Sequence, residues 1–99
     1  MPRDFRDIDP RELRVTGERC SGADLFKLHH QIARFGASNV GMPPIVVYEA
    51  TDGVLVIYNG VTRATRIAKL SPGTFVRVEV IGKLKRPYAN DPKIGDLLP

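Results

Sequence analysis

The sequence has one cysteine, no tryptophan and no long hydrophobic run. Cys20 stands alone among the 99 residues, which excludes an internal disulfide and a cysteine-based metal cluster. No apolar stretch approaches the roughly 20 residues that span a bilayer, so we expect no membrane partner. The N-terminal residues also lack the apolar segment of a secretory signal. The single cysteine predicts the reducing cytoplasm, and a length of 99 residues predicts a single domain.

The sequence also has only a small excess of charge of one sign. Fifteen lysines and arginines against eleven acidic residues give a formal net charge of +4. The basic residues form no continuous run, and the densest group is Lys83, Lys85 and Arg86. A protein that holds nucleic acid by charge alone normally has a stronger basic stripe. The charge therefore permits an anionic ligand without identifying it, and nothing in the sequence specifies an oligomeric state.

A first helix is predicted between a cap at Ser21 or Asp24 and a stop at Gly36. Its apolar stripe, at helical spacing, consists of Leu25, Leu28, Ile32 and Phe35. His29 falls beside this stripe, so we expect its side chain to be half buried. The alternative is that His29 is a general base close to a phosphate site.

Two strands, a second helix and a further strand are predicted after the first helix. Residues 45–50 are β-branched and aromatic, residues 54–58 are apolar at nearly every position, and an Asp-Gly pair at 52–53 is typical of a hairpin turn. Residues 61–70 suit a short helix, and residues 74–81 alternate as a half-buried strand does. This order predicts an α+β fold with a mixed sheet, a β-hairpin and two main helices.

Composition divides the chain into three parts. Residues 1–22 alternate in charge and contain prolines and glycines, so we expect an irregular N-terminal arm with one short strand near residues 13–15. The folded domain is predicted to span residues 8–82. Residues 83–99 form a basic tail with three prolines, which we expect to wrap around the domain or to be partly loose.

The junction between the second strand and the second helix carries the functional signal. Gly60 opens that helix, whose first N–H groups have no internal partner and attract anions such as phosphate. Arg63 and Arg66 lie three residues apart, so their guanidinium groups can converge. A cation in the first turn opposes the helix dipole, and a bound anion would remove this conflict. In the alternative interpretation both arginines are solvated or paired with acidic side chains.

Two further predictions concern the same segment. Asn59 is expected to cap the helix, with a ligand contact as the alternative. Helical geometry also separates the helix into two faces. The apolar face, expected to pack on the sheet, consists of Val61, Ala64, Ile67 and Ala68.

The segment from Tyr58 to Ala68 resembles the Gly-x-x-Arg-type box of the ParB/sulfiredoxin-like superfamily. Its flanks agree in the same order along residues 8–82. The segment Ile8–Leu13 resembles the opening motif of ParB-type domains, Met42–Val47 their Pro-Ile-x-Val passage, and Phe75–Val80 their closing strand. The superfamily includes chromosome-partitioning CTPases, ParB-like nucleases, a free-serine kinase and sulfiredoxin.

The resemblance implies a phosphate site for a nucleotide or a nucleic acid. On this analogy Gly60, Thr62, Arg63 and Arg66 would hold the phosphate. Asn59 and His29 are accessory candidates because of their own positions in the chain and not because of the analogy. Whether the protein also has nuclease or nucleotide hydrolase activity is left open. Such an activity would use Mg²⁺, bound together with the nucleotide, as a cofactor. No residue stands out as the nucleophile or the general base, so the catalytic residues stay unknown.

Two departures from the family pattern argue against particular activities of family members. Sulfiredoxins carry a catalytic cysteine directly after the motif glycine, where this sequence has Val61, so sulfiredoxin activity is not expected. Partitioning proteins carry a glutamate there and a second arginine beside the motif arginine. Val61 and Thr62 occupy those places, so CTP hydrolysis of that type is not expected. A second hypothesis, of another class, is a non-catalytic module that binds a protein partner.

Overall fold

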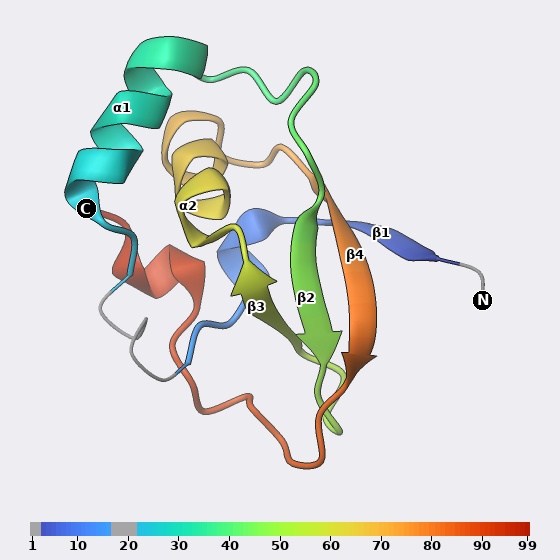
Figure 1. Ribbon diagram of the computed structural model, residues 1–99. Coiled ribbons are helices and arrows are strands. Elements are labelled where there is room, and N and C mark those ends of the chain that lie inside the picture. Colours follow the sequence, from blue (N-terminus) through green and yellow to red (C-terminus); the bar gives the residue numbers. More distant parts are fainter. Residues whose placement is uncertain (1–2, 17–21) are drawn as a thin grey trace.

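The sheet of this computed structural model has four strands, in the order β1-β4-β2-β3 (Figure 1). The structure describes residues 3–16 and 22–99. The strands are β1 (Asp4–Ile8), β2 (Ile45–Glu49), β3 (Leu55–Asn59) and β4 (Val76–Lys83). β4 pairs antiparallel with β1 and parallel with β2, whereas β2 and β3 form the antiparallel hairpin. The predicted α+β fold with a mixed sheet is confirmed.

Two helices, α1 (Leu25–Phe35) and α2 (Val61–Leu70), lie on one side of the sheet. α2 joins β3 to β4 and has the bounds that the sequence predicts. α1 lies farther from the sheet and packs against α2 (Figure 1). Short 3-10 helices, η1 (Pro10–Glu12) and η3 (Ile94–Leu97), complete this layer. Within the described residues, no helix is long and apolar enough to cross a membrane.

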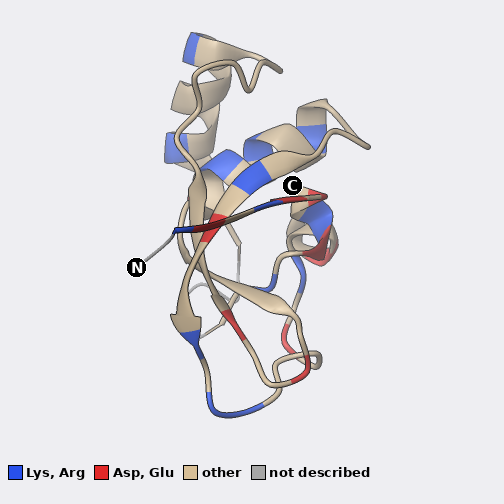
Figure 2. Cartoon of the chain, turned by 90° about the vertical axis from the view of Figure 1, so that its right-hand side faces the viewer, with Lys and Arg blue, Asp and Glu red and all other residues tan. Residues whose placement is uncertain are grey.

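β1 corrects the expectation of an irregular arm over residues 1–22, because residues 4–8 form a regular edge strand. Figure 2 shows this strand across the front of the molecule, with basic and acidic segments along it. Arg6 lies opposite Val78 of β4, yet its guanidinium forms ion pairs of 3.0 Å with both Asp4 and Glu49. Since ion pairs take the place of apolar contacts here, the strand lacks the apolar alternation that predicts strands.

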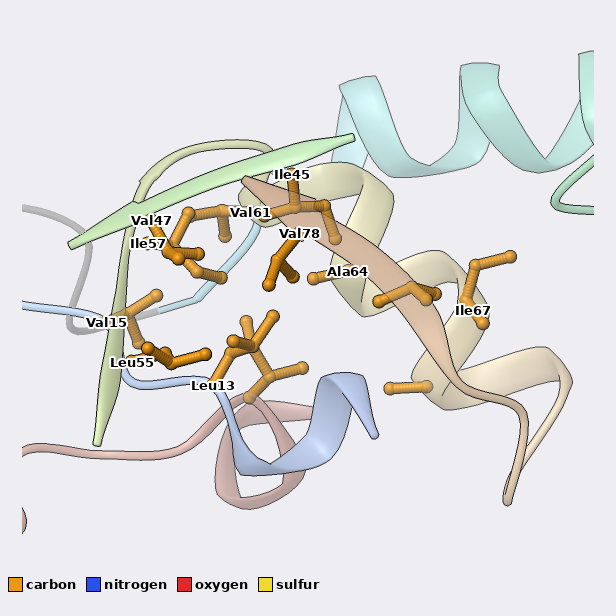
Figure 3. Close-up of a cluster of buried hydrophobic side chains, with 13 residues drawn as sticks. Leu13, Val15, Ile45, Val47, Leu55, Ile57, Val61, Ala64, Ile67 and Val78 are labelled. Atoms are coloured by element: carbon orange, nitrogen blue, oxygen red, sulfur yellow. The ribbon is translucent and has the colours of Figure 1, made fainter. Parts of the chain in front are cut away.

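The hydrophobic core fills the space between the sheet, α2 and the two 3-10 segments (Figure 3). The predicted apolar face of α2 is buried, with every one of its four residues at most 7% exposed. The sheet and the flanking segments contribute Leu13, Val15, Ile45, Val47, Leu55, Ile57, Val76, Val78 and Ile94. Since β3 and α2 share this core, the junction between them at Gly60 is fixed in space.

The outer edge of β3 is covered by both ends of the chain. The N–H of Arg14 donates to the carbonyl of Leu55, and the N–H of Ile57 donates to the carbonyl of Arg14, each at 2.9 Å. The C-terminal tail then pairs with this segment, where the N–H of Ile94 donates to the carbonyl of Leu13 at 2.8 Å. The predicted short strand near residues 13–15 therefore exists as an isolated bridge, and the tail wraps around the domain.

α1 is a capped helix whose apolar stripe is mostly uncovered. The N–H of Lys27 donates to the Asp24 carboxylate at 3.1 Å, so Asp24 is the cap, while Ser21 lies outside the described residues. Within the stripe only Leu28 is buried, and Phe35 is 48% exposed, because α1 packs on α2 rather than on the sheet. The same placement leaves His29 exposed, so the prediction of a half-buried His29 is wrong.

Candidate functional site

A cleft of about 660 Å³ lies between α1, the start of α2 and the loop that follows α1. All four residues predicted to hold phosphate line it, and so does Asn59, whereas His29 does not. Three segments form the walls. The lining residues are Gly22, Ala23, Asp24, Lys27, Gln31 and Phe35 from α1 and its start, Val40, Gly41, Met42 and Pro43 from the loop, and Asn59, Gly60, Val61, Thr62, Arg63 and Arg66 from the junction.

Gly60 is the N-cap of α2 and brings the backbone close to the arginine of the first turn. Its φ of +121° lies in the left-handed region that favours glycine. A Cβ at this position would lie 2.9 Å from Arg63 Nη2 and 3.1 Å from Ile45 Cγ2. A side chain would therefore be strained by the backbone conformation and crowded by its neighbours.

Within the part of the chain that the structure describes, no side chain caps the first turn of α2. The first backbone bond runs from the N–H of Ala64 to the carbonyl of Gly60, at 2.9 Å, which leaves the N–H groups of residues 61–63 without helical partners. The predicted cap by Asn59 is therefore wrong. The chain ends β3 at Asn59 and uses Gly60 as the N-cap, so the Asn59 side chain stands one position too early.

Arg66 is 2% exposed and binds backbone carbonyls rather than acidic side chains. Its Nη1 donates to the carbonyls of Gly36 and Ser38, at 2.8 and 2.6 Å. Its Nε lies 3.4 Å from Gln31 Oε1. These carbonyls follow the C-terminus of α1, where the helix dipole attracts a cation. Arg66 therefore ties α1 and its loop to α2, an arrangement that neither alternative of the sequence analysis includes.

Arg63 is only partly buried and keeps most of its hydrogen-bonding capacity. Its Nη2 lies 3.4 Å from the carbonyl of Asn59, a long contact for a charged donor. No ion pair of the described residues includes Arg63 or Arg66. Burial lowers the pKa of the Arg63 guanidinium, but an arginine stays charged at neutral pH. Arg63 and the uncapped N–H groups thus place positive charge at one end of the cleft.

The α1 wall of the cleft adds Lys27 and Gln31, which are not among the predicted site residues, and Phe35, which is predicted only as part of the apolar stripe. Lys27, Gln31 and Phe35 lie at four-residue spacing, so they share one face of α1. Phe35 carries the guanidinium of Arg66 at 5.3 Å from its ring centroid. The four-residue spacing of Lys27 and Gln31 indicates a polar face on α1. The prediction for this helix rests on the neighbouring apolar stripe instead.

The acidic side of the site is sparse. Among the described residues that line the cleft, Asp24 is the one acidic residue, and its carboxylate accepts the N–H of Lys27 at the start of α1. In the part of the chain that the structure describes, no three histidine, cysteine, aspartate or glutamate side chains group as a metal site. The described lining of the cleft therefore holds three cations and one carboxylate that is already hydrogen-bonded, an arrangement suited to an anion.

Compared with protein-family models and with curated proteins, the chain matches none. The resemblance to the ParB/sulfiredoxin-like superfamily thus stays a prediction. Function is inferred from the geometry of the cleft and from the residues that line it.

Proposed function

We propose that the protein binds the phosphate group of a nucleotide or a nucleic acid at the start of α2. The observation that carries this proposal is the uncapped first turn of α2, beside a partly buried arginine that has no acidic partner within residues 3–16 and 22–99. Backbone N–H groups at a helix start hold phosphate oxygens well, because the helix dipole adds to their own partial charge.

Each predicted residue has a distinct part in this proposal. Gly60 leaves the approach to the backbone open, since a side chain here would crowd Arg63. Arg63 turns its guanidinium to the phosphate as a bidentate donor, and the Thr62 hydroxyl adds a further hydrogen bond. Arg66 acts indirectly, because its bonds to Gly36 and Ser38 hold the loop that closes the cleft.

The size and lining of the cleft favour a nucleotide unit over a bare phosphate ion. A volume of about 660 Å³ lies within the range typical of small-molecule sites. Phe35 lines the same cleft and is about half exposed, and an aromatic ring stacks on a base irrespective of its identity. The family resemblance supports the same ligand class, because it implies a phosphate site for a nucleotide or a nucleic acid at this junction.

A thermal-shift panel tests the proposal. Mono-, di- and triphosphate nucleotides and short single- and double-stranded DNA are added to the wild type, and at least one of them should raise the melting temperature. The rise should weaken with salt and vanish in Arg63→Ala, but persist in Lys69→Ala, a matched loss of charge on the exposed side of α2. The proposal fails when no ligand raises the melting temperature, or when Arg63→Ala responds as the wild type does.

Hydrolysis of the bound phosphate is a separate question with its own assay. Phosphate release and DNA cleavage are measured with and without added Mg²⁺, using the ligand that gives the largest thermal shift. Activity that depends on Mg²⁺ and is lost in Arg63→Ala would show that the protein is an enzyme that hydrolyses the ligand it binds. Binding without turnover would define a nucleotide-binding module.

A second candidate function, binding of a protein partner, is favoured by the outer face of α1 and its loop. Leu25 and Phe26 are neighbours at the start of α1 and are 54% and 82% exposed, while Val40 in the loop after α1 is 89% exposed. An adjacent pair of large apolar side chains in solvent is typical of a protein-binding surface. A photo-crosslinking residue at position 26, with the same residue at position 69 as control, tests this function. One protein captured at position 26 alone would support it, and capture at both positions or at neither would not.

A further inference from the structure

The two edge strands of the sheet, β3 and β1, differ in whether their outer side is paired. The Arg14 segment covers β3, whereas β1 pairs with β4 on one side and with no other segment of the described residues on the other. Figures 1 and 2 show β1 at the open edge, with no strand beyond it. An edge strand presents a row of unpaired N–H and C=O groups, which another strand can extend.

The sequence of this edge is self-complementary in charge. Arg3-Asp4-Phe5-Arg6-Asp7 carries opposite charges at equal distances from Phe5. Two identical antiparallel strands are related by a two-fold axis, which falls on a residue facing its own copy. With Phe5 on that axis, Arg3 faces Asp7 of the second copy and Asp4 faces Arg6. Every charged residue of the segment then faces the opposite charge.

We propose that the β1 edge pairs antiparallel with the β1 edge of a second copy, so that two sheets join into one. Phe5 is 40% exposed and would meet its own copy at the centre of this interface. Aromatic pairs and opposite charges directly across two strands stabilise the pairing of the strands. The partner is therefore a second chain of this protein.

Neighbouring registers are disfavoured by the same residues. An axis on Arg6 sets Arg6 against its own copy and Phe5 against Asp7. An axis on Asp4 sets two Asp4 carboxylates together and Arg3 against Phe5. Since like charges across a strand pair destabilise it, the charges exclude these registers and permit the one centred on Phe5.

The ion pairs within each chain are compatible with this interface. Arg3 binds Glu79 at 2.7 Å and lies 4.8 Å from the Phe5 ring centroid, so its guanidinium is already held beside the axis. Asp7 lies 3.8 Å from Arg77, and both side chains are more than 60% exposed. Because so exposed a pair contributes little, Asp7 can share its carboxylate with Arg3 of the second copy.

Reversing one charge at a time tests the register. Sedimentation velocity over a concentration series should show a reversible dimer for the wild type. Asp7→Arg and Arg3→Asp, each alone, should remain monomeric, because each sets like charges across the axis twice. An equimolar mixture of these two variants should form a heterodimer, since every charge then again faces its opposite. The double variant R3D/D7R should dimerise with itself.

A cross-link tests the position of the axis. In a chain with Cys20→Ser, Phe5→Cys should form an intermolecular disulfide on mild oxidation, because residues facing each other across antiparallel strands have Cα atoms within disulfide reach. Phe75→Cys, on an exposed residue preceding β4, is the matched control and should not cross-link.

Several results would overturn the proposal. One is a wild type that stays monomeric throughout the concentration series. Another is a dimer that survives both single reversals, which would place the interface elsewhere. A third is a mixture of the two reversed variants that remains monomeric while circular dichroism shows both to be folded.

Discussion

Arg63 and Arg66 lie within one turn of α2, but they occupy different surroundings. Arg66 is buried, with the carbonyls of Gly36 and Ser38 as acceptors. Arg63 is partly exposed, and within the described residues its guanidinium has one long contact, to the carbonyl of Asn59. The spacing of two arginines in a motif therefore does not define a common role. Their hydrogen-bond acceptors distinguish the arginine that holds the fold from the one that is available to a ligand.

Substitution of Arg66 by alanine should have the largest effect on stability. It removes a fully buried side chain and leaves two backbone carbonyls without donors, which together cost about 3 kcal/mol of unfolding free energy. Urea denaturation measures the loss. The control Lys69→Ala, on an exposed residue of the same helix, should change the unfolding free energy by less than about 0.5 kcal/mol. Equal losses for the two variants would contradict the structural role of Arg66.

Gly60→Ala should lower the unfolding free energy by about 2 kcal/mol and weaken phosphate binding. The backbone at φ +121° is unfavourable for alanine, and the new Cβ would crowd Arg63 and Ile45. Gly73→Ala is the matched control, because Gly73 has a φ of +86° but open space around the missing Cβ. A smaller loss for Gly73→Ala isolates the effect of the close approach, and thermal and urea melts of both variants give the difference.

Arg63→Ala should separate binding from stability. Removal of a cation from the first turn relieves its conflict with the helix dipole, so the unfolding free energy should stay the same or rise by about 0.5 kcal/mol. Phosphate affinity should fall at least about tenfold, because the charged bidentate donor is lost. Isothermal titration and urea denaturation on the same variant measure both quantities. A clear loss of unfolding free energy in Arg63→Ala would contradict the claim that Arg66, and not Arg63, stabilises the fold.

Asn59→Ala should have the smallest effect, within about 0.5 kcal/mol of the wild type. The side chain does not cap α2, and Arg63 contacts the backbone carbonyl, which alanine keeps. Thermal denaturation checks the stability. A loss near 1 kcal/mol, typical of a removed cap, would show that the Asn59 side chain does support the helix start.

Local patterns predict those parts of the fold that local forces define. α2 has the predicted bounds because Gly60 and an apolar face at helical spacing specify it, and the hairpin follows from the Asp-Gly turn. β1 is not predicted because Arg6 within it and Arg3 just before it pair with Glu49 and Glu79, which are far away in the sequence. The role of Arg66 is not predicted for a similar reason. Its acceptors are backbone carbonyls after the end of α1, and every residue has a carbonyl, so no residue type marks them in the sequence.

The measurement that tests the phosphate site most directly is an NMR titration of the ¹⁵N-labelled protein with inorganic pyrophosphate and with a nucleoside triphosphate. The amide resonances of Val61, Thr62 and Arg63 should show the largest shifts, since their N–H groups would donate to the phosphate. These shifts should disappear in Arg63→Ala and persist in Lys69→Ala. Amides that do not respond, or that respond equally in Arg63→Ala, would contradict a phosphate site at the start of α2.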